Sequence, residues 1–269
     1  TIWRYLDYVI NAKNWNRWDM TTEYGAIAAI ILGLILGLKH ATDADHVVAV
    51  TTMVSEFKNP LRSLWVGASW GLGHTTPLFI LGIIILMFKE AVLDRYEAVA
   101  PVLEFGVAIM LVFLGLQVFW NLKKGRLLHT HQHDHDEGPH LHIHGTHSPE
   151  EAPEVEKTHG KFFIGKPFFR MKSFVIGIIH GLAGSAAVML VLLPTIESFI
   201  AGLLYLILFG IGTIVSMSII TIIISVPFAM SGNNMKLNNA VNSVAGLASI
   251  LFGLALGSDL ALGTTIIPF

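Results

Sequence analysis

Long apolar runs constrain what this chain can fold into more than any other feature of its sequence. Runs of about 20 residues or more alternate with short polar connections, and this is the length a helix needs to cross the hydrocarbon core of a bilayer. Of the 269 residues, 53% are hydrophobic and 13% are charged, whereas soluble domains carry roughly a quarter charged residues. The pattern predicts a polytopic membrane protein that has the lipid bilayer as its partner.

The apolar runs predict six membrane-spanning segments. The expected spans are 23–56, 62–88, 98–122, 172–197, 199–230 and 239–257. All should be helices, because lipid offers the backbone no hydrogen-bond partner unless the chain forms a closed barrel. The expected fold class is therefore an all-α polytopic membrane protein.

The two halves of the sequence resemble each other at a nearly constant offset. The matched pairs are Gly37 with Gly177, His40 with His180, Gly73 with Gly212, and Gly115 with Gly253. Three spans per half is an odd number, so the halves would enter the membrane in opposite directions, as two inverted three-helix repeats. The alternative is chance, since glycine is common in membrane helices.

Four parts follow from this organisation. Residues 1–22 combine tryptophans with charges, which suits an interfacial N-terminal segment or, alternatively, a frayed terminus. Residues 23–122 and 172–269 form the two transmembrane halves, and 123–171 form a His-rich loop. The excess of Lys and Arg on the loop side places this loop in the cytoplasm and both termini outside. The chain begins without a methionine, so we expect an initiator or a longer leader to be missing, and no signal peptide is visible.

Several classes of function are disfavoured by what the sequence lacks. There is no cysteine, which excludes a disulfide framework and a thiolate metal site. The net charge is -2 and the basic residues do not cluster with aromatics, so nucleic acid is not expected as a partner. No phosphate-binding loop of the ATPase type is present, so ATP is not expected to supply the energy.

Polar residues interrupt the first predicted span at its middle. The segment from His40 to His46 reads His-Ala-Thr-Asp-Ala-Asp-His, and a charged residue at the bilayer centre is disfavoured by several kcal/mol. The span is too long for one straight crossing, so we predict a break that lines a cavity. On an ideal helix His40, Asp43 and His46 share one face. Asp45 would join them only if the helix unwinds locally.

Imidazoles and carboxylates without sulfur are ligands that suit nickel, cobalt, zinc or manganese. His40, Asp43, Asp45 and His46 are therefore candidate metal ligands. The alternatives are a buried His–Asp hydrogen bond that holds a helix break, and a proton relay.

Two further histidines lie in predicted spans. His74 is midway along the second span and could supply a third imidazole, or it could be a packed, hydrogen-bonded residue. His180 is the counterpart of His40 in the second half, where Ala183, Ser185 and Ala186 replace the other candidate ligands. It could be an outer ligand or gate, or it could serve packing alone.

The segment from His129 to His147 holds eight of the 13 histidines, often at alternate positions. It is polar and punctuated by Gly and Pro, so we expect a flexible segment that binds metal weakly and at several places, as a buffer or sensor. The alternative is a solvated linker.

These motifs resemble those of a known family. Gly37-Leu-Lys-His-Ala-Thr-Asp-Ala-Asp-His-Val47 resembles the signature of the nickel/cobalt transporter family, and Leu72-Gly-His-Thr75 resembles its second block. His180-Gly-Leu-Ala-Gly-Ser185 resembles the short, urease-accessory-like branch. The likeness covers the transmembrane part of the chain.

The resemblance implies a secondary transporter, not an enzyme, that imports nickel(II) or cobalt(II) across the cytoplasmic membrane. With the ion held between two inverted halves, we predict that transport occurs by alternating access. The ion would be the transported substrate, and no cofactor is implied. His40, Asp45 and His46 are carried over as essential, with Asp43 and His74 as contributors. An intracellular nickel chaperone, or a urease or hydrogenase maturation system, would be the partner.

Two alternatives share some of these features. The related nickel/cobalt efflux proteins also have a His-rich loop, but their pattern lacks the Asp-Ala-Asp-His ending, which favours uptake. A membrane metalloenzyme of the histidine-box type needs several His clusters at the cytoplasmic face. The four histidines within the predicted spans lie at mid-span instead.

Overall fold

The computed structural model of the chain describes residues 23–55, 59–88, 90–124, 129–133, 140–144, 169–182, 192–231 and 234–267. The N-terminal segment predicted to lie in the interface, 1–22, falls outside these residues. The described ranges are helical apart from one two-stranded hairpin, so the expectation of a helical membrane protein is confirmed for them.

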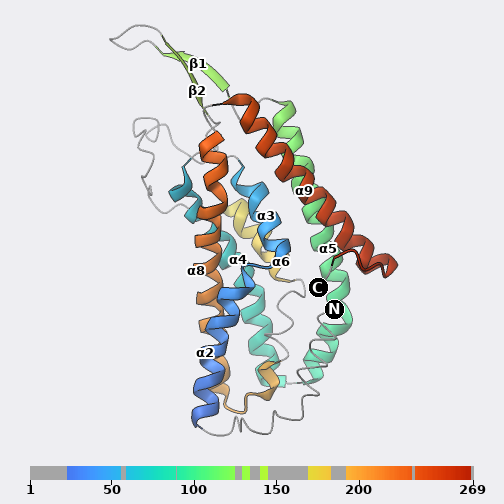
Figure 1. Cartoon of the computed structure of the whole chain (residues 1–269). Helices are drawn as coiled ribbons and strands as arrows, with labels where there is room; N and C mark the ends of the chain where they lie inside the picture. Colours follow the sequence, from blue (N-terminus) through green and yellow to red (C-terminus); the bar gives the residue numbers. More distant parts are fainter. Residues whose placement is uncertain are drawn as a thin grey trace.

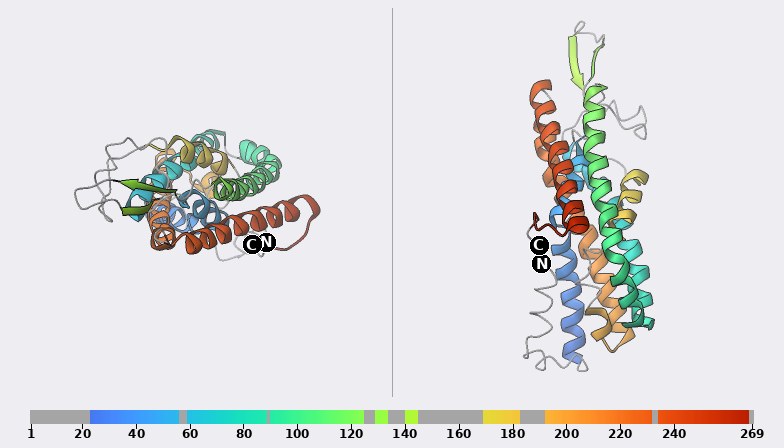
Figure 2. Two further views of the ribbon diagram at one scale, coloured as in Figure 1. Left: turned by 90° about the horizontal axis from the view of Figure 1, so that it is seen from above. Right: turned by 90° about the vertical axis from the view of Figure 1, so that its right-hand side faces the viewer.

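The helices follow one another along the chain in an up-and-down arrangement (Figure 1). In order, the elements are α2 (Glu23–His40), α3 (Ala44–Val54), α4 (Pro60–Phe88), α5 (Glu90–Lys123), β1 (His129–His133), β2 (His140–His144), α6 (Met171–Gly181), the 3-10 turn η4 (Leu193–Thr195), α8 (Phe199–Ser231) and α9 (Met235–Leu262). The hairpin lies at one end of the bundle, beyond the end of α5 (Figures 1 and 2).

Four helices are each long and apolar enough to cross a membrane: α4, Ala98–Lys123 within α5, α8 and α9. α2 and α3, bent by 52° between them, are together long and apolar enough to count as a fifth span if the bent pair crosses as one. The described residues thus contain up to five spans. For the predicted span 172–197, the structure describes the short apolar helix α6 but not residues 183–191. The sixth span therefore remains a prediction.

The exposed surface of these helices is apolar, as lipid requires. Large side chains such as Val102 of α5, Ile223 of α8 and Val244 of α9 are more than 60% exposed. Several buried Ser and Thr hydroxyls donate to backbone carbonyls of their own helix, as where Thr221 donates to the Met217 oxygen at 2.6 Å. A soluble fold would place these residue types the other way round.

Four helix contacts build the bundle. α4 packs along α8 and α5 along α9, while α2 lies against α8 and α6 against α4. α4 and α8 run antiparallel, because Gly67 lies against Thr221 near one end of the pair and Gly82 against Leu206 near the other. Seen end-on, α5 and α9 form one flank of the molecule (Figure 2).

The His-rich loop contains the hairpin of β1 and β2, which was not expected. The strands pair antiparallel, with the Cα atoms of His129 opposite His144, His131 opposite His142, and His133 opposite His140. Alternation at every second position is the period of a strand. The alternating histidines therefore indicated strands, although we expected a flexible segment here.

Candidate metal centre

The first apolar span breaks directly after His40. α2 ends there, Ala41 to Asp43 form a turn, and α3 starts at Ala44 at an angle of 52° to α2. A break frees backbone carbonyls in the membrane, where each needs a new partner. The Leu38 carbonyl accepts a hydrogen bond of 2.8 Å from the Ser216 hydroxyl of α8. The predicted break at the motif is therefore confirmed, and a neighbouring helix donates a hydrogen bond to a carbonyl beside it.

The first group of contacts joins the break to α4. His40 Nδ1 lies 2.9 Å from Asp43 Oδ2, and His40 Nε2 lies 2.8 Å from His74 Nε2. Asp43 is the N-cap residue of α3, yet its carboxylate makes no capping bond. It orients the His40 ring instead. If Asp43 is ionised, His40 carries its proton on Nδ1, so His74 Nε2 must donate the hydrogen bond between the two rings.

The second group joins the break to α6. The Asp45 carboxylate lies between two histidines, with His46 Nδ1 2.9 Å from Oδ1 and His180 Nε2 2.8 Å from Oδ2. The rings of His46 and His180 are 4.2 Å apart between centroids. One carboxylate therefore fixes the orientation of imidazoles from two distant parts of the chain.

The four histidine rings form one buried cluster. His46, His74 and His180 are fully buried, and His40 is 6% exposed. Three ring nitrogens have no hydrogen-bond partner among the described residues: His46 Nε2, His74 Nδ1 and His180 Nδ1. Buried polar atoms are rarely left without a partner, and each such atom calls for an explanation. A ligand that accepts an imidazole lone pair would supply one for His46 Nε2, because the Nδ1 atom of that ring is already bonded to Asp45.

Two sets of three side chains have the spacing of a metal site. The ligand atoms of His40, His46 and His74 lie within 4.8 Å of one another, and so do those of Asp45, His46 and His180. His46 belongs to both sets. The cluster therefore has donors of the imidazole and carboxylate type that divalent transition metals bind.

The backbone around the cluster also favours a cation. α2 ends at His40 and α6 ends at Gly181, so the C-termini of two short helices meet at the histidines. A helix C-terminus carries a partial negative charge of roughly half an elementary charge. Half-helices that end in this way inside a membrane are a known means of holding cations.

All six predicted site residues lie in this one cluster: His40, Asp43, Asp45, His46, His74 and His180. Asp45, which an unbroken helix would point away, is brought in because the helix breaks at His40. Two aromatic residues were not predicted. The Phe209 ring lies 5.6 Å from the His40 ring, and the Trp70 ring lies 5.5 Å from the His46 ring.

Known proteins place the chain in a family. It is 38% identical over 228 residues to the urease accessory protein UreH of Bacillus sp. (strain TB-90), a match that covers 85% of this chain and 90% of UreH. It is also 24% and 23% identical to the Arabidopsis thaliana chloroplast proteins FOR GROWTH AND FERTILITY 2 and 1. Those matches cover 83% and 86% of this chain but only 54% and 59% of the plant proteins.

No family model and no solved structure matches the chain. The match to UreH extends over nearly the full length of both proteins, and it agrees with the branch that the motif at His180 indicated. The chain therefore belongs to the family of UreH, the urease-accessory-like branch of the nickel/cobalt transporters.

Proposed function

We propose that this protein is a secondary transporter that imports nickel(II) or cobalt(II) across the cell membrane. The observation that carries the proposal is the cluster of four buried histidines, the buried carboxylate of Asp45 and the partly exposed carboxylate of Asp43, at a break between two apolar helices. Ionisable residues inside a membrane are costly and typically mark the path of an ion.

In this proposal the ion is held first by His40, His46 and His74. Their ligand atoms are close enough for one ion to bind all three. The distance of 2.8 Å between His40 Nε2 and His74 Nε2 is close to the separation of about 2.9 Å expected for two ligands at right angles with metal–nitrogen bonds of about 2.0–2.1 Å. Ligands at right angles suit the tetragonal geometry of nickel(II).

Binding of the ion requires a proton shift at His74. The hydrogen bond between His40 and His74 uses the nitrogen pair that the ion would bind, so His74 must move its proton from Nε2 to Nδ1. His74 Nδ1 has no other partner among the described residues, which leaves it free to take the proton. The ion then replaces the hydrogen bond between the rings.

The two carboxylates act mainly by orienting the ligands. Asp43 fixes the ring of His40 and Asp45 fixes that of His46, each through Nδ1. This leaves Nε2 of both rings for the ion, and a carboxylate on the far nitrogen also raises the basicity of the ligand. His180 shares Asp45 and belongs to the second set of donors, where it would act as an outer ligand.

Contacts between the halves support two inverted repeats and alternating access. Gly37 packs on the carbonyl of Phe209, and its counterpart Gly177 packs on the carbonyl of Trp70. Phe209 and Trp70 are themselves separated by nearly the same offset, 139 positions. In the same way Gly73 packs on Phe174 and Gly212 on Leu34, and Gly115 packs on Gly246 and Gly253 on Ala108. Reciprocal contacts of this kind are what a pseudo-two-fold axis between the halves produces.

The name of the Bacillus relative agrees with a role in supplying metal. UreH is called a urease accessory protein, which fits delivery of the ion to a cytoplasmic nickel chaperone or to a urease or hydrogenase maturation system. The His-rich loop would buffer the ion on that side.

Uptake of radiolabelled nickel and cobalt into proteoliposomes tests the proposal. Wild type should accumulate both ions or one of them, and His46→Ala should not, because His46 belongs to both sets of donors. His159→Ala, which removes a histidine of the polar loop, is the matched control and should transport normally. Equal transport by wild type and His46→Ala would sink the proposal.

Efflux is the second candidate, because the related exporters also carry a His-rich loop. Growth of cells with and without the protein separates the two directions. Import predicts higher cellular nickel and greater sensitivity to toxic nickel on expression. Resistance to toxic nickel together with lower cellular nickel would indicate export instead of import.

A further inference from the structure

Two aromatic rings border the histidine cluster on different sides. Phe209 of α8 contacts His40, with 5.6 Å between ring centroids. Trp70 of α4 contacts His46 at 5.5 Å and His180 at 5.8 Å. Trp70 is 1% exposed and Phe209 is 3% exposed. Phe209 thus borders the first set of donors at His40, and Trp70 borders the second set at His180 and the shared ligand His46, with both rings buried against the cluster.

The two rings occupy equivalent places in the two halves of the chain. Gly37 of α2 packs on the Phe209 carbonyl, and Gly177 of α6 packs on the Trp70 carbonyl. The two glycines correspond to each other in the two halves, and so do the two residues they pack on, at nearly the same offset in the sequence. An inverted repeat therefore relates Phe209 to Trp70, and it would direct them to opposite faces of the membrane.

The antiparallel run of α4 and α8 places the rings on either side of His74. Trp70 precedes His74 by about one turn of α4, toward the end where Gly67 meets Thr221. Phe209 lies near the level of Leu78, toward the end where Gly82 meets Leu206, because Phe209 and Leu78 line the same cavity. Moving along the bundle, the order is Trp70, then the histidines, then Phe209.

We infer that Phe209 and Trp70 are the two gates of the ion site, each closing it toward one face of the membrane; this inference rests on the proposed transport function. A buried aromatic ring blocks water and hydrated ions. When it moves aside, its π face can attract the passing cation. Alternating access requires that one gate opens while the other stays closed.

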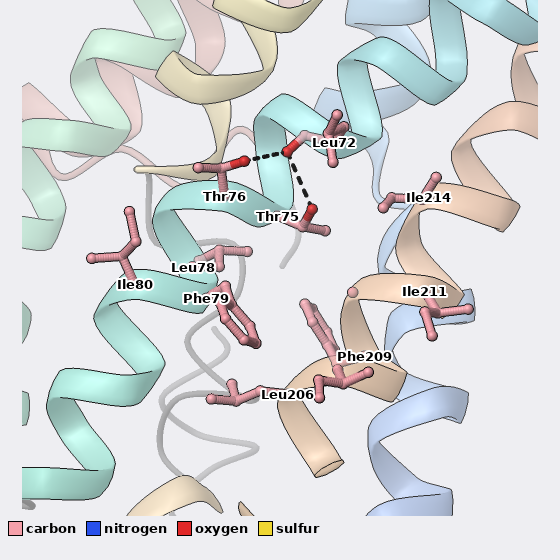
Figure 3. Close-up of a pocket in the computed structure, with 12 residues that line it drawn as sticks. Leu72, Thr75, Thr76, Leu78, Phe79, Ile80, Leu206, Phe209, Ile211 and Ile214 are labelled. Carbon is pink, nitrogen blue, oxygen red and sulfur yellow. Dashed lines mark hydrogen bonds between the residues drawn. The ribbon is translucent and has the colours of Figure 1, made fainter. Parts of the chain in front are cut away.

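Phe209 has open space beside it, and Trp70 makes no described hydrogen bond that would hold its ring in place. Phe209 borders a cavity of about 300 Å³ between α4 and α8, lined almost entirely by apolar side chains. In Figure 3 the Phe209 ring points into this space, beside Phe79 and Leu206. Thr75 and Thr76, the hydroxyl residues of the lining, donate to carbonyls of their own helix. Trp70 Nε1 has no hydrogen-bond partner among the described residues, so no polar contact seen there holds that ring closed.

The chain suits a test by thiol labelling because it contains no cysteine. His74→Cys places a single reporter thiol inside the cluster, at a position that is fully buried. The reporter is then combined with Phe209→Ala or with Trp70→Ala. A membrane-impermeant methanethiosulfonate reagent is added to right-side-out spheroplasts or to inverted vesicles. Phe228→Ala is the matched control, since it removes a similarly buried ring from α8 that has no ring contact with the histidines among those described.

Each gate variant should expose the reporter from one face only. Phe209→Ala should raise the labelling rate from the outside and Trp70→Ala from the cytoplasmic side, each by at least about tenfold, a change that corresponds to about 1.4 kcal/mol in the opening equilibrium. Phe228→Ala should change neither rate. If either alanine variant fails to fold, Phe209→Leu or Trp70→Leu takes its place, because leucine keeps much of the packing but not the cover of the ring.

The gate inference is overturned if both variants open the same face, or if neither labels faster than the Phe228→Ala control. This result is separate from the proposed function, because the reporter measures access without nickel. Nickel uptake by wild type tests the function on its own. If nickel uptake is normal but labelling is not specific to one face, the gate inference is wrong and the transport function stands. If labelling is specific to each face but there is no nickel uptake, the transport function is wrong and the gate inference stands.

Discussion

Asp45 on the first turn of α3 accepts a hydrogen bond from His180 on the last turn of α6 at 2.8 Å, although 135 residues separate them. Its other oxygen binds His46 at 2.9 Å. A single carboxylate therefore links the candidate metal motif of the first half to its counterpart in the second half. In the proposed transport cycle, movement of one half relative to the other would change this contact, so Asp45 would couple ion binding to that movement.

Replacement of Asp45 should weaken nickel binding without removing a ligand of the first set. Asn in Asp45→Asn can accept from one ring through its oxygen, but its NH₂ group cannot accept from the other. We expect nickel affinity to fall by about 10- to 100-fold, the usual effect of losing a carboxylate behind a metal ligand. Calorimetric titration measures it, with the eight histidines between His129 and His147 replaced by asparagine so that only the cluster is titrated.

Asp259→Asn is the control for this variant. Asp259 lies near the end of α9 and binds Thr264 and the backbone of Ile266, with no contact to the histidine cluster among those described. Its replacement should leave nickel affinity unchanged. An affinity that drops equally in both variants would mean that general loss of acidic charge, and not orientation of the rings, is responsible.

The two histidines outside the motif should differ in their effect. His74→Ala removes a member of the first donor set and should lower nickel affinity by more than the about 10- to 100-fold of an orienting residue. His180→Ala loosens Asp45 and should stay within that range. Titrations of both variants beside His159→Ala decide it. If His180→Ala lowers nickel affinity more than His74→Ala does, the ion binds first among Asp45, His46 and His180.

Acid should weaken nickel binding. Imidazoles must be neutral to ligate a metal, so protons and nickel compete for the same nitrogens. An imidazole has an unperturbed pKa of about 6.5, and affinity should therefore fall as the pH is lowered from 8 to 5, more steeply if several histidines bind at once. Titrations across this range give the slope. A flat curve is incompatible with ligation by histidine.

The close approach of α6 to α4 should not tolerate a methyl group. An added Cβ at Gly177 would overlap the Trp70 carbonyl oxygen, and overpacking of this kind typically destabilises by about 1–3 kcal/mol. Gly106→Ala is the matched control, because nothing lies within 4 Å of its added Cβ. Thermal unfolding in detergent should show a lower midpoint for Gly177→Ala and an unchanged or higher one for Gly106→Ala. Equal midpoints would contradict the packing described.

The helical membrane class and the broken first span followed from the sequence because both depend on simple rules. Apolar runs of sufficient length mark spans, and charges at the middle of an overlong run mark a break. The six candidate ligands were found because ionisable residues in a membrane are rare and each was worth naming.

Other features depend on which helices become neighbours, and no local pattern carries that information. The positions of Phe209 and Trp70 beside the histidines could be seen only once α8 and α4 were placed against α2 and α6. The Ser216 hydroxyl bridges two helices, because it donates to the Leu38 carbonyl of α2. Thr213 and Ser218 do not do so through their hydroxyls, because each donates to a carbonyl one turn back in α8. The sequence does not show whether such a hydroxyl will donate to a carbonyl of its own helix or to one of a neighbouring helix.

Nickel binding by the cluster alone is the most direct test of the central claim. The eight histidines between His129 and His147 would also bind nickel, so they are first replaced by asparagine. Equilibrium dialysis then compares this chain with the same chain carrying His46→Ala. The account predicts one tightly bound nickel per chain in the first protein and none in the second. Equal binding by the two proteins, or no tight binding by the first, would contradict it.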